Sequence, residues 1–212
     1  MEQNKNSNNK LNKIIIILSI IIAAFSFYML VYVELPNKPL AGKGDSFAGN
    51  AAIGGDFVLT DYNGNKFSSE NLKGKLSLIY FGFTYCPDIC PTTLQKLTNV
   101  LSVLDKYQID VNPVFITIDP NRDKAALIKE YLGHFHPKFI GLTGSEEEVR
   151  KTANLFKVYY AKSQDPSYTG GNYMVDHSSF IYLMDKNGKY MKHFYFSTTP
   201  EEIVEYIRLN KG

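Results

Sequence analysis

The sequence lacks an excess of either charge beyond its first residues. It holds 23 lysines and arginines against 21 aspartates and glutamates. Lys5, Lys10, Lys13 and Glu2 account for the difference, so the rest of the chain is formally neutral. Without a basic stripe or patch, the chain offers no electrostatic footprint for DNA or RNA. The composition therefore excludes nucleic acid from the expected partners.

One long stretch lacks charge altogether. Residues 14–33 read IIIILSIIIAAFSFYMLVYV, and as a helix they would span roughly the 30 Å hydrocarbon layer of a bilayer. A signal peptide has a shorter apolar core that ends at small residues, whereas this run continues into YMLVYVELP. It also has no nearby cysteine for lipoprotein processing. We therefore expect a single transmembrane anchor at 14–33.

Arginine is absent from the segment before this run. A transit peptide is rich in arginine and forms an amphipathic helix, whereas MEQNKNSNNKLNK is polar and rich in asparagine. Its lysines predict a cytoplasmic tail over 1–13, with the rest of the chain across the membrane. These features favour a single-pass protein of the bacterial inner membrane with its domain in the periplasm. Residues 34–52, rich in Gly, Pro, Ala and Asn, predict a flexible tether.

Residues 53–212 are expected to form one domain. Short apolar runs alternate with helical stripes, and Asn63-Gly64 and Asn187-Gly188 each separate two strand-like runs, as in a tight hairpin. This order predicts an α/β fold, a thioredoxin-like three-layer sandwich with an extra N-terminal β-hairpin. The expected strands include 76–83, 111–119, 139–144, 178–185 and 189–196, and helices are expected from Pro91, over Lys124 to Leu132, from Ser145 to about Phe156, and from Thr199.

Only two cysteines are present, and both lie in FGFTYCPDICPTTL. Cys86 and Cys90 follow a predicted buried strand and precede a predicted helix, at the sheet edge where open α/β folds place their sites. Their separation puts both sulfurs on one helical face. Free N–H groups at the helix start favour the thiolate, which metal binding and disulfide exchange both need. The spacing of the cysteines alone does not decide between metal binding and disulfide exchange. A structural disulfide closing so short a loop would remove little chain entropy.

Histidine is scarce too, and one of the four stands apart. His177 lies in VDHSSFIYLMD, just before a strand expected to lie beside the cysteine strand. Its side chain can therefore face the cysteine loop. Two thiolates suit Cu(I) or zinc, and an imidazole would add a third donor. Three protein donors are too few for a closed structural zinc site, but they suit copper that is held and passed on.

Three separated motifs resemble those of the copper chaperones for cytochrome oxidase assembly called SCO or SenC proteins. The motifs are FTYCPDICP (83–91), TIDPNRD (117–123) and VDHSSFIYLMDKNG (175–188). They agree with the family in residue and in spacing. The resemblance extends from about Ile53 to the C-terminus.

The resemblance implies a function as well as a thioredoxin-like copper-binding domain. In that family the corresponding residues bind copper, so Cys86, Cys90 and His177 are the expected ligands for Cu(I), and Cu(II) with a further donor. The implied role is delivery of copper to the binuclear centre of the copper-bearing subunit of cytochrome c oxidase. A thiol-disulfide role at the same cysteines is also implied. Further expected partners are other copper chaperones or thiol reductants.

The alternative is a periplasmic thiol-disulfide reductase acting on cysteines of an oxidase subunit or of another chaperone. Such enzymes usually have two residues between their cysteines, and here there are three. They also carry a proline before the strand that faces the cysteines, where this chain reads DHSS. We therefore expect a binding protein rather than an enzyme.

Some polar residues near these motifs have simpler explanations. Asp119 and Asp123 at the end of a predicted strand are expected to serve in helix capping and in a local pair with Arg122. Support of the site or contact with a partner is the alternative for these two carboxylates. Asp88 is expected to accept a local N–H or to meet a partner, and not to be a ligand. His134 and His136 are expected to be exposed, with a second metal as the alternative, and His193 is expected to serve in packing.

Overall fold

The computed structural model describes residues 15–29, 52–163 and 173–211. The chain divides into two compact units, Met1–Asn50 and Ala51–Gly212. The predicted tail at 1–13, positions 14 and 30–33 of the predicted anchor, and tether residues 34–51 lie outside the described residues.

In the first unit, the described residues form one helix over 15–29. At about 1.5 Å per residue, the described part of this helix covers roughly 22 Å. Within the described ranges, no helix is both long enough and apolar enough to cross a membrane. The predicted localisation, a single-pass protein of the bacterial inner membrane with a periplasmic domain, is therefore wrong.

A seven-stranded mixed sheet forms the centre of the second unit. Its strands are β1 (Val58–Asp61), β2 (Lys66–Ser68), β3 (Leu76–Gly82), β4 (Val111–Thr117), β5 (Ile140–Thr143), β8 (Ile181–Met184) and β9 (Tyr190–Phe194). They follow the order β2-β1-β5-β4-β3-β8-β9. β4 runs parallel to both of its neighbours. β8 lies beside β3, as predicted, and pairs antiparallel with it. All seven residues of β3 are buried because the strand is covered on both faces.

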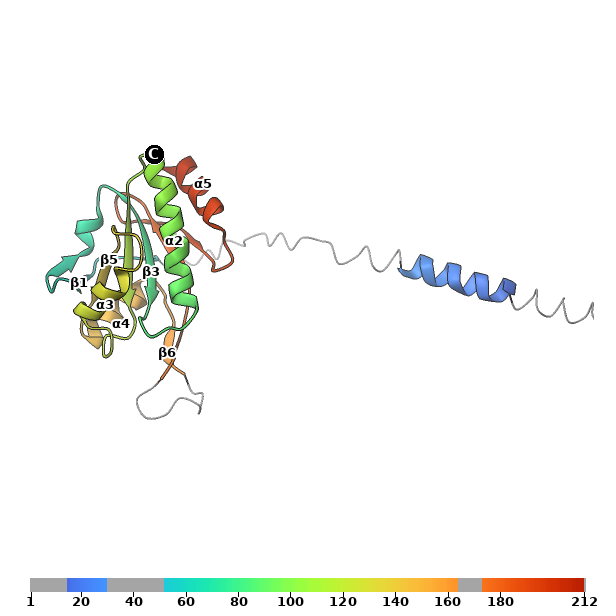
Figure 1. The fold of residues 1–212 in the computed structure, drawn as a ribbon, viewed down its shortest axis with the longest axis horizontal. Helices are drawn as coiled ribbons and strands as arrows, with labels where there is room; N and C mark the ends of the chain where they lie inside the picture. Colours follow the sequence, from blue (N-terminus) through green and yellow to red (C-terminus); the bar gives the residue numbers. More distant parts are fainter. Residues whose placement is uncertain (1–14, 30–51, 164–172, 212) are drawn as a thin grey trace, which may run out of the picture. The chain divides into compact units, whose positions relative to one another are not determined.

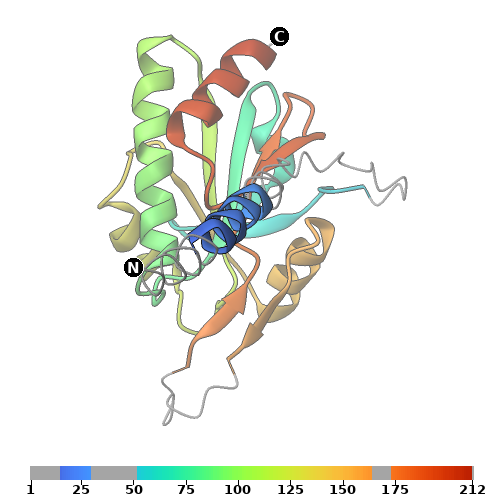
Figure 2. The ribbon, with the colours of Figure 1, turned by 90° about the vertical axis from the view of Figure 1, so that its right-hand side faces the viewer.

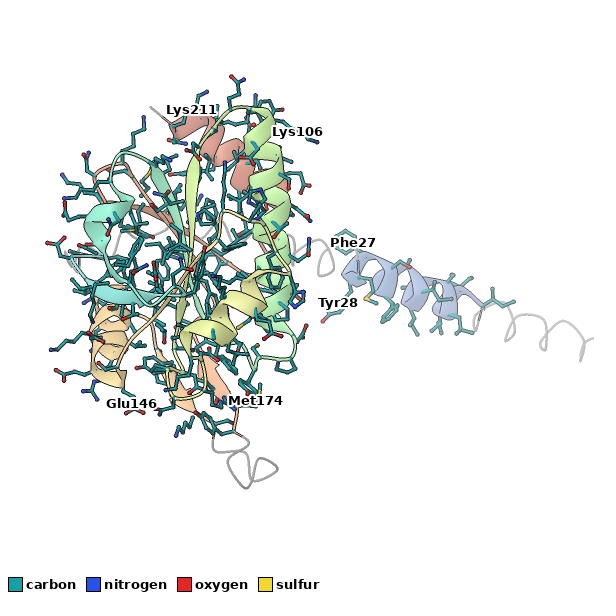
Figure 3. All side chains as sticks on the ribbon, turned by 60° about the vertical axis from the view of Figure 1, so that its left-hand side comes forward. Phe27, Tyr28, Lys106, Glu146, Met174 and Lys211 are labelled. Atoms are coloured by element: carbon teal, nitrogen blue, oxygen red, sulfur yellow. The ribbon has the colours of Figure 1, made fainter. Side chains whose placement is uncertain are left out.

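Helices cover both faces of this sheet. They are α2 (Ile89–Lys106), α3 (Ala125–Leu132), α4 (Glu146–Leu155) and α5 (Pro200–Asn210), with a short 3-10 helix η1 (Ser69–Leu72) after β2. Figure 1 shows α2 and α5 side by side, and Figure 2 shows them on one side of the sheet with α4 on the other. Lys106 and Lys211, at the C-terminal ends of these neighbouring helices, lie at the same end of the domain (Figure 3).

The side chains of β3 divide between the two helical layers. Tyr80 packs beside Phe115 of β4, which in turn meets Tyr131 of α3. Phe81 instead contacts Phe156, just after α4. This alternation follows from the two-residue period of a strand. The α/β prediction is confirmed, as is the N-terminal hairpin, in which β1 pairs antiparallel with β2.

A second, smaller sheet was not predicted. β6 (Tyr160–Lys162) pairs antiparallel with β7 (Val175–His177), with Tyr160 opposite His177. The pair projects from the lower end of the domain in Figure 1. Strands of three residues are too short for a periodic pattern to reveal them. His177 therefore ends a strand of this second sheet rather than lying directly before a strand of the main sheet.

Candidate metal and redox site

The loop from β3 to α2 brings both cysteines to the carboxyl edge of the sheet. A Cβ added at Gly82, the last residue of β3, would lie 3.0 Å from Cys90 Sγ and 2.9 Å from the Tyr80 ring. Glycine therefore lets the sulfur approach the strand backbone closely. α2 begins at Ile89, two residues earlier than predicted, so Cys90 lies in its first turn. The Asp88 side chain makes no capping hydrogen bond, which leaves N–H groups free at this end.

Cys86 is half-buried, and its sulfur faces those N–H groups. Its Sγ accepts a hydrogen bond from the Cys90 backbone N–H at 3.4 Å. The hydrogen bond from the Cys90 thiol lowers the pKa of Cys86, burial opposes it, and the backbone N–H groups of Asp88, Cys90 and Ile89 bring the pKa down to about 6. The thiolate therefore predominates at neutral pH, as expected for a cysteine beside a helix start.

Cys90 differs from Cys86 in its environment, because its side chain is fully buried. The Tyr80 hydroxyl donates a hydrogen bond to its sulfur at 3.5 Å. The hydrogen bond to Cys86, together with burial and the nearby Cys86 charge, raises the pKa of Cys90 well above its usual range. Neither Cys86 nor Cys90 forms a disulfide in this structure. The site thus combines an outer thiolate with an inner protonated thiol.

His177 reaches the inner sulfur from β7. Its Nε2 lies 3.6 Å from Cys90 Sγ, and its Nδ1 lies 3.1 Å from the Ser178 carbonyl oxygen. A carbonyl only accepts, so Nδ1 carries the hydrogen and Nε2 presents its lone pair to the sulfur. The rings of Phe83 and Tyr80 hold the imidazole edge-on, at centroid distances of 6.0 and 6.3 Å. Burial lowers the pKa of His177, which keeps the ring in the neutral form that binds metals.

The structure brings the three predicted ligands together in two contacts, Cys86 with Cys90 and Cys90 with His177. Over residues 15–29, 52–163 and 173–211, no group of three or more His, Cys, Asp or Glu side chains is already arranged to hold a metal ion. The three-ligand set therefore stays a prediction. Its chemistry fits a soft ion, because two sulfurs and an imidazole lone pair are the donors that Cu(I) prefers.

The two aspartates after β4 have different roles. Asp119 pairs with Arg122, as predicted. Asp123 does not cap α3, because the N-cap there is Lys124 and no side chain caps the helix. Its buried carboxylate instead accepts hydrogen bonds from Thr84, at 3.0 Å from the backbone N–H and 2.5 Å from the hydroxyl. The capping prediction is wrong for Asp123, which ties the loop after β4 to the cysteine loop.

The other three histidines differ from one another in exposure and in contacts. His134 is exposed, as predicted. His136 is only 10% exposed and lies 3.3 Å from the Asp105 carboxylate, so the prediction of a surface residue is wrong for it. His193 contacts the Tyr190 hydroxyl at 2.6 Å among several aromatic rings, in agreement with a packing role.

Comparison with known proteins identifies the family. A family model described as SCO1/SenC matches residues 46–210. The chain belongs to the SCO1/SenC family. A SCO2-like protein of Rickettsia felis is 54% identical over 202 residues, which cover 93% of this chain and 96% of the relative.

Solved structures of Sco proteins share the fold of this SCO1/SenC chain. Bradyrhizobium japonicum ScoI with copper bound matches with a TM-score of 0.68 and 42% identity, over 74% of this chain and 99% of that one. BsSco, a member of the Sco family of cytochrome c oxidase assembly proteins in which a disulfide switch was identified, matches with a TM-score of 0.59 and 28% identity. That match covers 74% of this chain and 92% of BsSco.

Sequence reasoning missed several residues that shape the site in this SCO1/SenC protein. Gly82 carried a usable signal, because a glycine at the end of a buried strand often marks a close approach of another group. Thr84, the partner of Asp123, had no such signal, since a threonine in a loop has many uses. Tyr80 is one of 15 tyrosines, and nothing in the sequence distinguishes it from the rest.

Proposed function

We propose that this SCO1/SenC protein binds copper through Cys86, Cys90 and His177 and delivers it to the copper-bearing subunit of cytochrome c oxidase. Copper is then cargo rather than a resident cofactor. The observation that carries the proposal is the 3.6 Å approach of His177 Nε2 to Cys90 Sγ, with Nδ1 fixed by the Ser178 carbonyl. The copper in ScoI and the assembly role named for the family of BsSco support it.

The three proposed ligands explain why copper can be both bound and released. Two sulfurs and one imidazole suit the soft Cu(I) ion. A set of three leaves a position open to a donor from the recipient, so copper can pass by exchange of ligands. Cys86 is more accessible than Cys90, because its side chain is half-buried and that of Cys90 is buried. We expect Cys86 to be the first ligand to meet copper and the first to release it.

A second candidate function is reduction of a disulfide in a partner, and the asymmetry of the two thiols favours it. The Cys86 thiolate would attack one sulfur of the target disulfide and expel the other as a thiolate. Cys90 would then attack the Cys86 sulfur, closing the Cys86–Cys90 disulfide and releasing the second target thiol. The Cys90 proton has an acceptor in His177 Nε2 at 3.6 Å. Two electrons pass from the pair to the target, and the disulfide switch identified in BsSco is consistent with such a step.

One experiment separates the two functions. Cu(I) affinity of the reduced full chain is measured anaerobically by competition with a chromophoric Cu(I) chelator, for the wild type, Cys86→Ser, Cys90→Ser and His177→Ala. Copper binding through the three residues predicts a large loss of affinity in each variant. His134→Ala is the matched control, because that histidine is exposed. An unchanged affinity in His177→Ala would contradict the three-ligand site.

The reductase function is tested on the same proteins. Reduction of a small disulfide substrate should be lost in Cys86→Ser, because no nucleophile of low pKa remains. It should largely survive in His177→Ala, since the imidazole only accepts a proton. Loss of copper binding with retained reduction in His177→Ala would assign the two functions to different members of one site.

A further inference from the structure

The groups that meet at the candidate site come from two separate parts of the fold. Cys86 and Cys90 belong to the loop and first turn after β3, which we call the cysteine arm (83–90). His177 ends β7, whose strand partner is β6 and which belongs to a different sheet from β3. We call residues 173–177 the histidine arm. Since the arms belong to different sheets, the strand ladders do not fix the distance between them.

The loop after β4 contacts the cysteine arm. Asp123 is fully buried, and its carboxylate accepts hydrogen bonds from the backbone N–H and the hydroxyl of Thr84. It also accepts one from the Thr117 hydroxyl at 2.7 Å. Thr84 lies two residues before Cys86. One buried carboxylate thus ties the start of the cysteine arm to the end of β4.

The same loop contacts the histidine arm. Asp119 is buried, with 4% of its surface exposed, and its Oδ1 accepts a hydrogen bond from the Tyr173 hydroxyl at 2.6 Å. Tyr173 lies four residues before His177. The other carboxylate oxygen, Oδ2, accepts from Arg122 Nε.

Arg122 lies between the two arms. The centre of its guanidinium is 3.7 Å from the Tyr173 ring of the histidine arm and 4.7 Å from the Tyr85 ring of the cysteine arm. Phe83 adds a third ring at 5.9 Å. Its Nη2 is buried and has no hydrogen-bond partner in the described part of the chain. The guanidinium is therefore held by one carboxylate and by stacking on aromatic rings from both arms.

We infer that Asp119, Arg122 and Asp123 form a bracket that sets the position of His177 relative to the cysteine pair. The bracket residues are positioning residues. None of them forms a hydrogen bond or a ring contact with Cys86, Cys90 or His177 in the structure. The inference rests on the proposed function where it concerns copper affinity. Residues that orient metal ligands typically affect metal affinity by about 10–100-fold when they are replaced.

The central test is Arg122→Met in the reduced full chain. This change keeps length and apolar contact but removes the charge and the planar face. We expect Cu(I) affinity, measured by chelator competition, to fall by about 10–100-fold. Arg122→Lys should lose nearly as much, because an ammonium keeps the charge but cannot stack between two rings.

A double-mutant comparison distinguishes positioning from general damage. If the bracket acts through His177, adding His177→Ala to Arg122→Met should lower the affinity much less than His177→Ala does in the wild type. Equal losses in both backgrounds would overturn the inference. Arg208→Met is the matched control, because Arg208 pairs with Glu205 at 3.0 Å and lies 4.3 Å from the Tyr107 ring, outside both arms.

A readout without copper tests the bracket by itself. Hydrogen exchange of the β6 and β7 amides should accelerate in Arg122→Met but not in Arg208→Met, with exchange in the main sheet unchanged. Unchanged exchange in β6 and β7 would overturn the bracket. If exchange accelerates while His177→Ala leaves copper affinity unchanged, the bracket holds the arms and the proposed copper site fails.

Two milder variants keep the inference testable should Arg122→Met fail to fold. Tyr173→Phe removes only the hydroxyl that bonds Asp119, and Thr84→Val removes only the hydroxyl that bonds Asp123. Each should accelerate exchange in its own arm and lower Cu(I) affinity. Normal exchange and normal affinity in both variants would overturn the bracket.

Discussion

At the scale of single residues, the site depends on two chemically identical side chains in opposite environments. Cys86 is half-buried and faces the N–H groups that begin α2, whereas Cys90 is buried beside Tyr80 and His177. The spacing of the cysteines predicted that both lie at a helix start. It could not predict which sulfur faces outward, because that depends on where the helix begins and on how closely Gly82 lets the inner sulfur approach.

Alkylation of the thiols should follow this asymmetry. In reduced protein we expect Cys86 to react with iodoacetamide at a rate that rises as pH passes through about 6 and levels off above it, because the pKa of Cys86 is lowered to that value. Cys90 should stay slow between pH 5 and 8, because its pKa is raised. Mass spectrometry of peptides after brief labelling measures both rates, with Cys86→Ser as the control. A Cys86 midpoint near the ordinary thiol value of about 8.5 would contradict the described geometry.

Gly82→Ala should disturb the site from the strand side. The added methyl would meet Cys90 Sγ and the Phe115 ring at 3.0 Å, so one of these groups has to move. Overpacking of a core usually costs about 1–3 kcal/mol. We expect a lower midpoint of urea unfolding and faster labelling of Cys90. If both stay at wild-type values, the approach of the sulfur to the strand is less tight than described.

At the scale of elements, helix ends were predicted more reliably than short strands. Helices were expected from Ser145 and from Thr199, and the structure has both, each begun by a hydroxyl that forms a capping box with the glutamate three residues later. The sequence pattern of such a helix start is local, so it can be recognised without knowledge of the fold. β6 and β7 give no comparable signal, because each has three residues and each depends on pairing with a distant segment. His177 was predicted as a ligand, but its position at the end of a strand in a second sheet was not.

Ser145→Ala should destabilise the second unit through α4 alone. The Ser145 hydroxyl accepts from the Glu148 N–H at 3.2 Å, and the Glu148 carboxylate accepts from the Ser145 N–H at 2.8 Å. Loss of an N-cap costs about 1 kcal/mol. Urea unfolding measures the change, and Ser102→Ala on the exposed side of α2 is the control. Because α4 does not contribute a predicted ligand, Cu(I) affinity should be unchanged in Ser145→Ala. A fall in affinity would show that α4 acts on the site.

At the scale of the whole molecule, the sheet and the approach of His177 to the cysteine loop could be predicted, whereas the second sheet that carries His177 could not. Alternating strands and helices limit the fold to few topologies, so the α/β sandwich followed from order and hydrophobic pattern. The predicted localisation is wrong because, over the described residues, no helix is long and apolar enough to cross a membrane. The bracket could not be predicted either, since its aspartates and arginine acquire meaning only when the cysteine and histidine arms lie on each side of them.

Copper should stabilise the folded chain as a whole. If copper binds the native state and not the unfolded chain, free Cu(I) at 100 times its dissociation constant adds about 2.7 kcal/mol to the unfolding free energy. Thermal unfolding of reduced protein with buffered Cu(I) measures this gain. Protein oxidised to the Cys86–Cys90 disulfide should gain little, because its sulfurs are no longer thiolates. An equal gain in reduced and oxidised protein would place copper elsewhere on the molecule.

The contact between Cys90 and His177 joins positions 87 residues apart, and this has a consequence during protein synthesis. At about 5–20 residues per second, a ribosome needs roughly 4–17 s to add the imidazole after the second sulfur. For that interval the nascent chain carries a reactive pair of thiols without the ring that completes the site. Premature oxidation of the newborn polypeptide is therefore a hazard that arises from the order in which its parts are made.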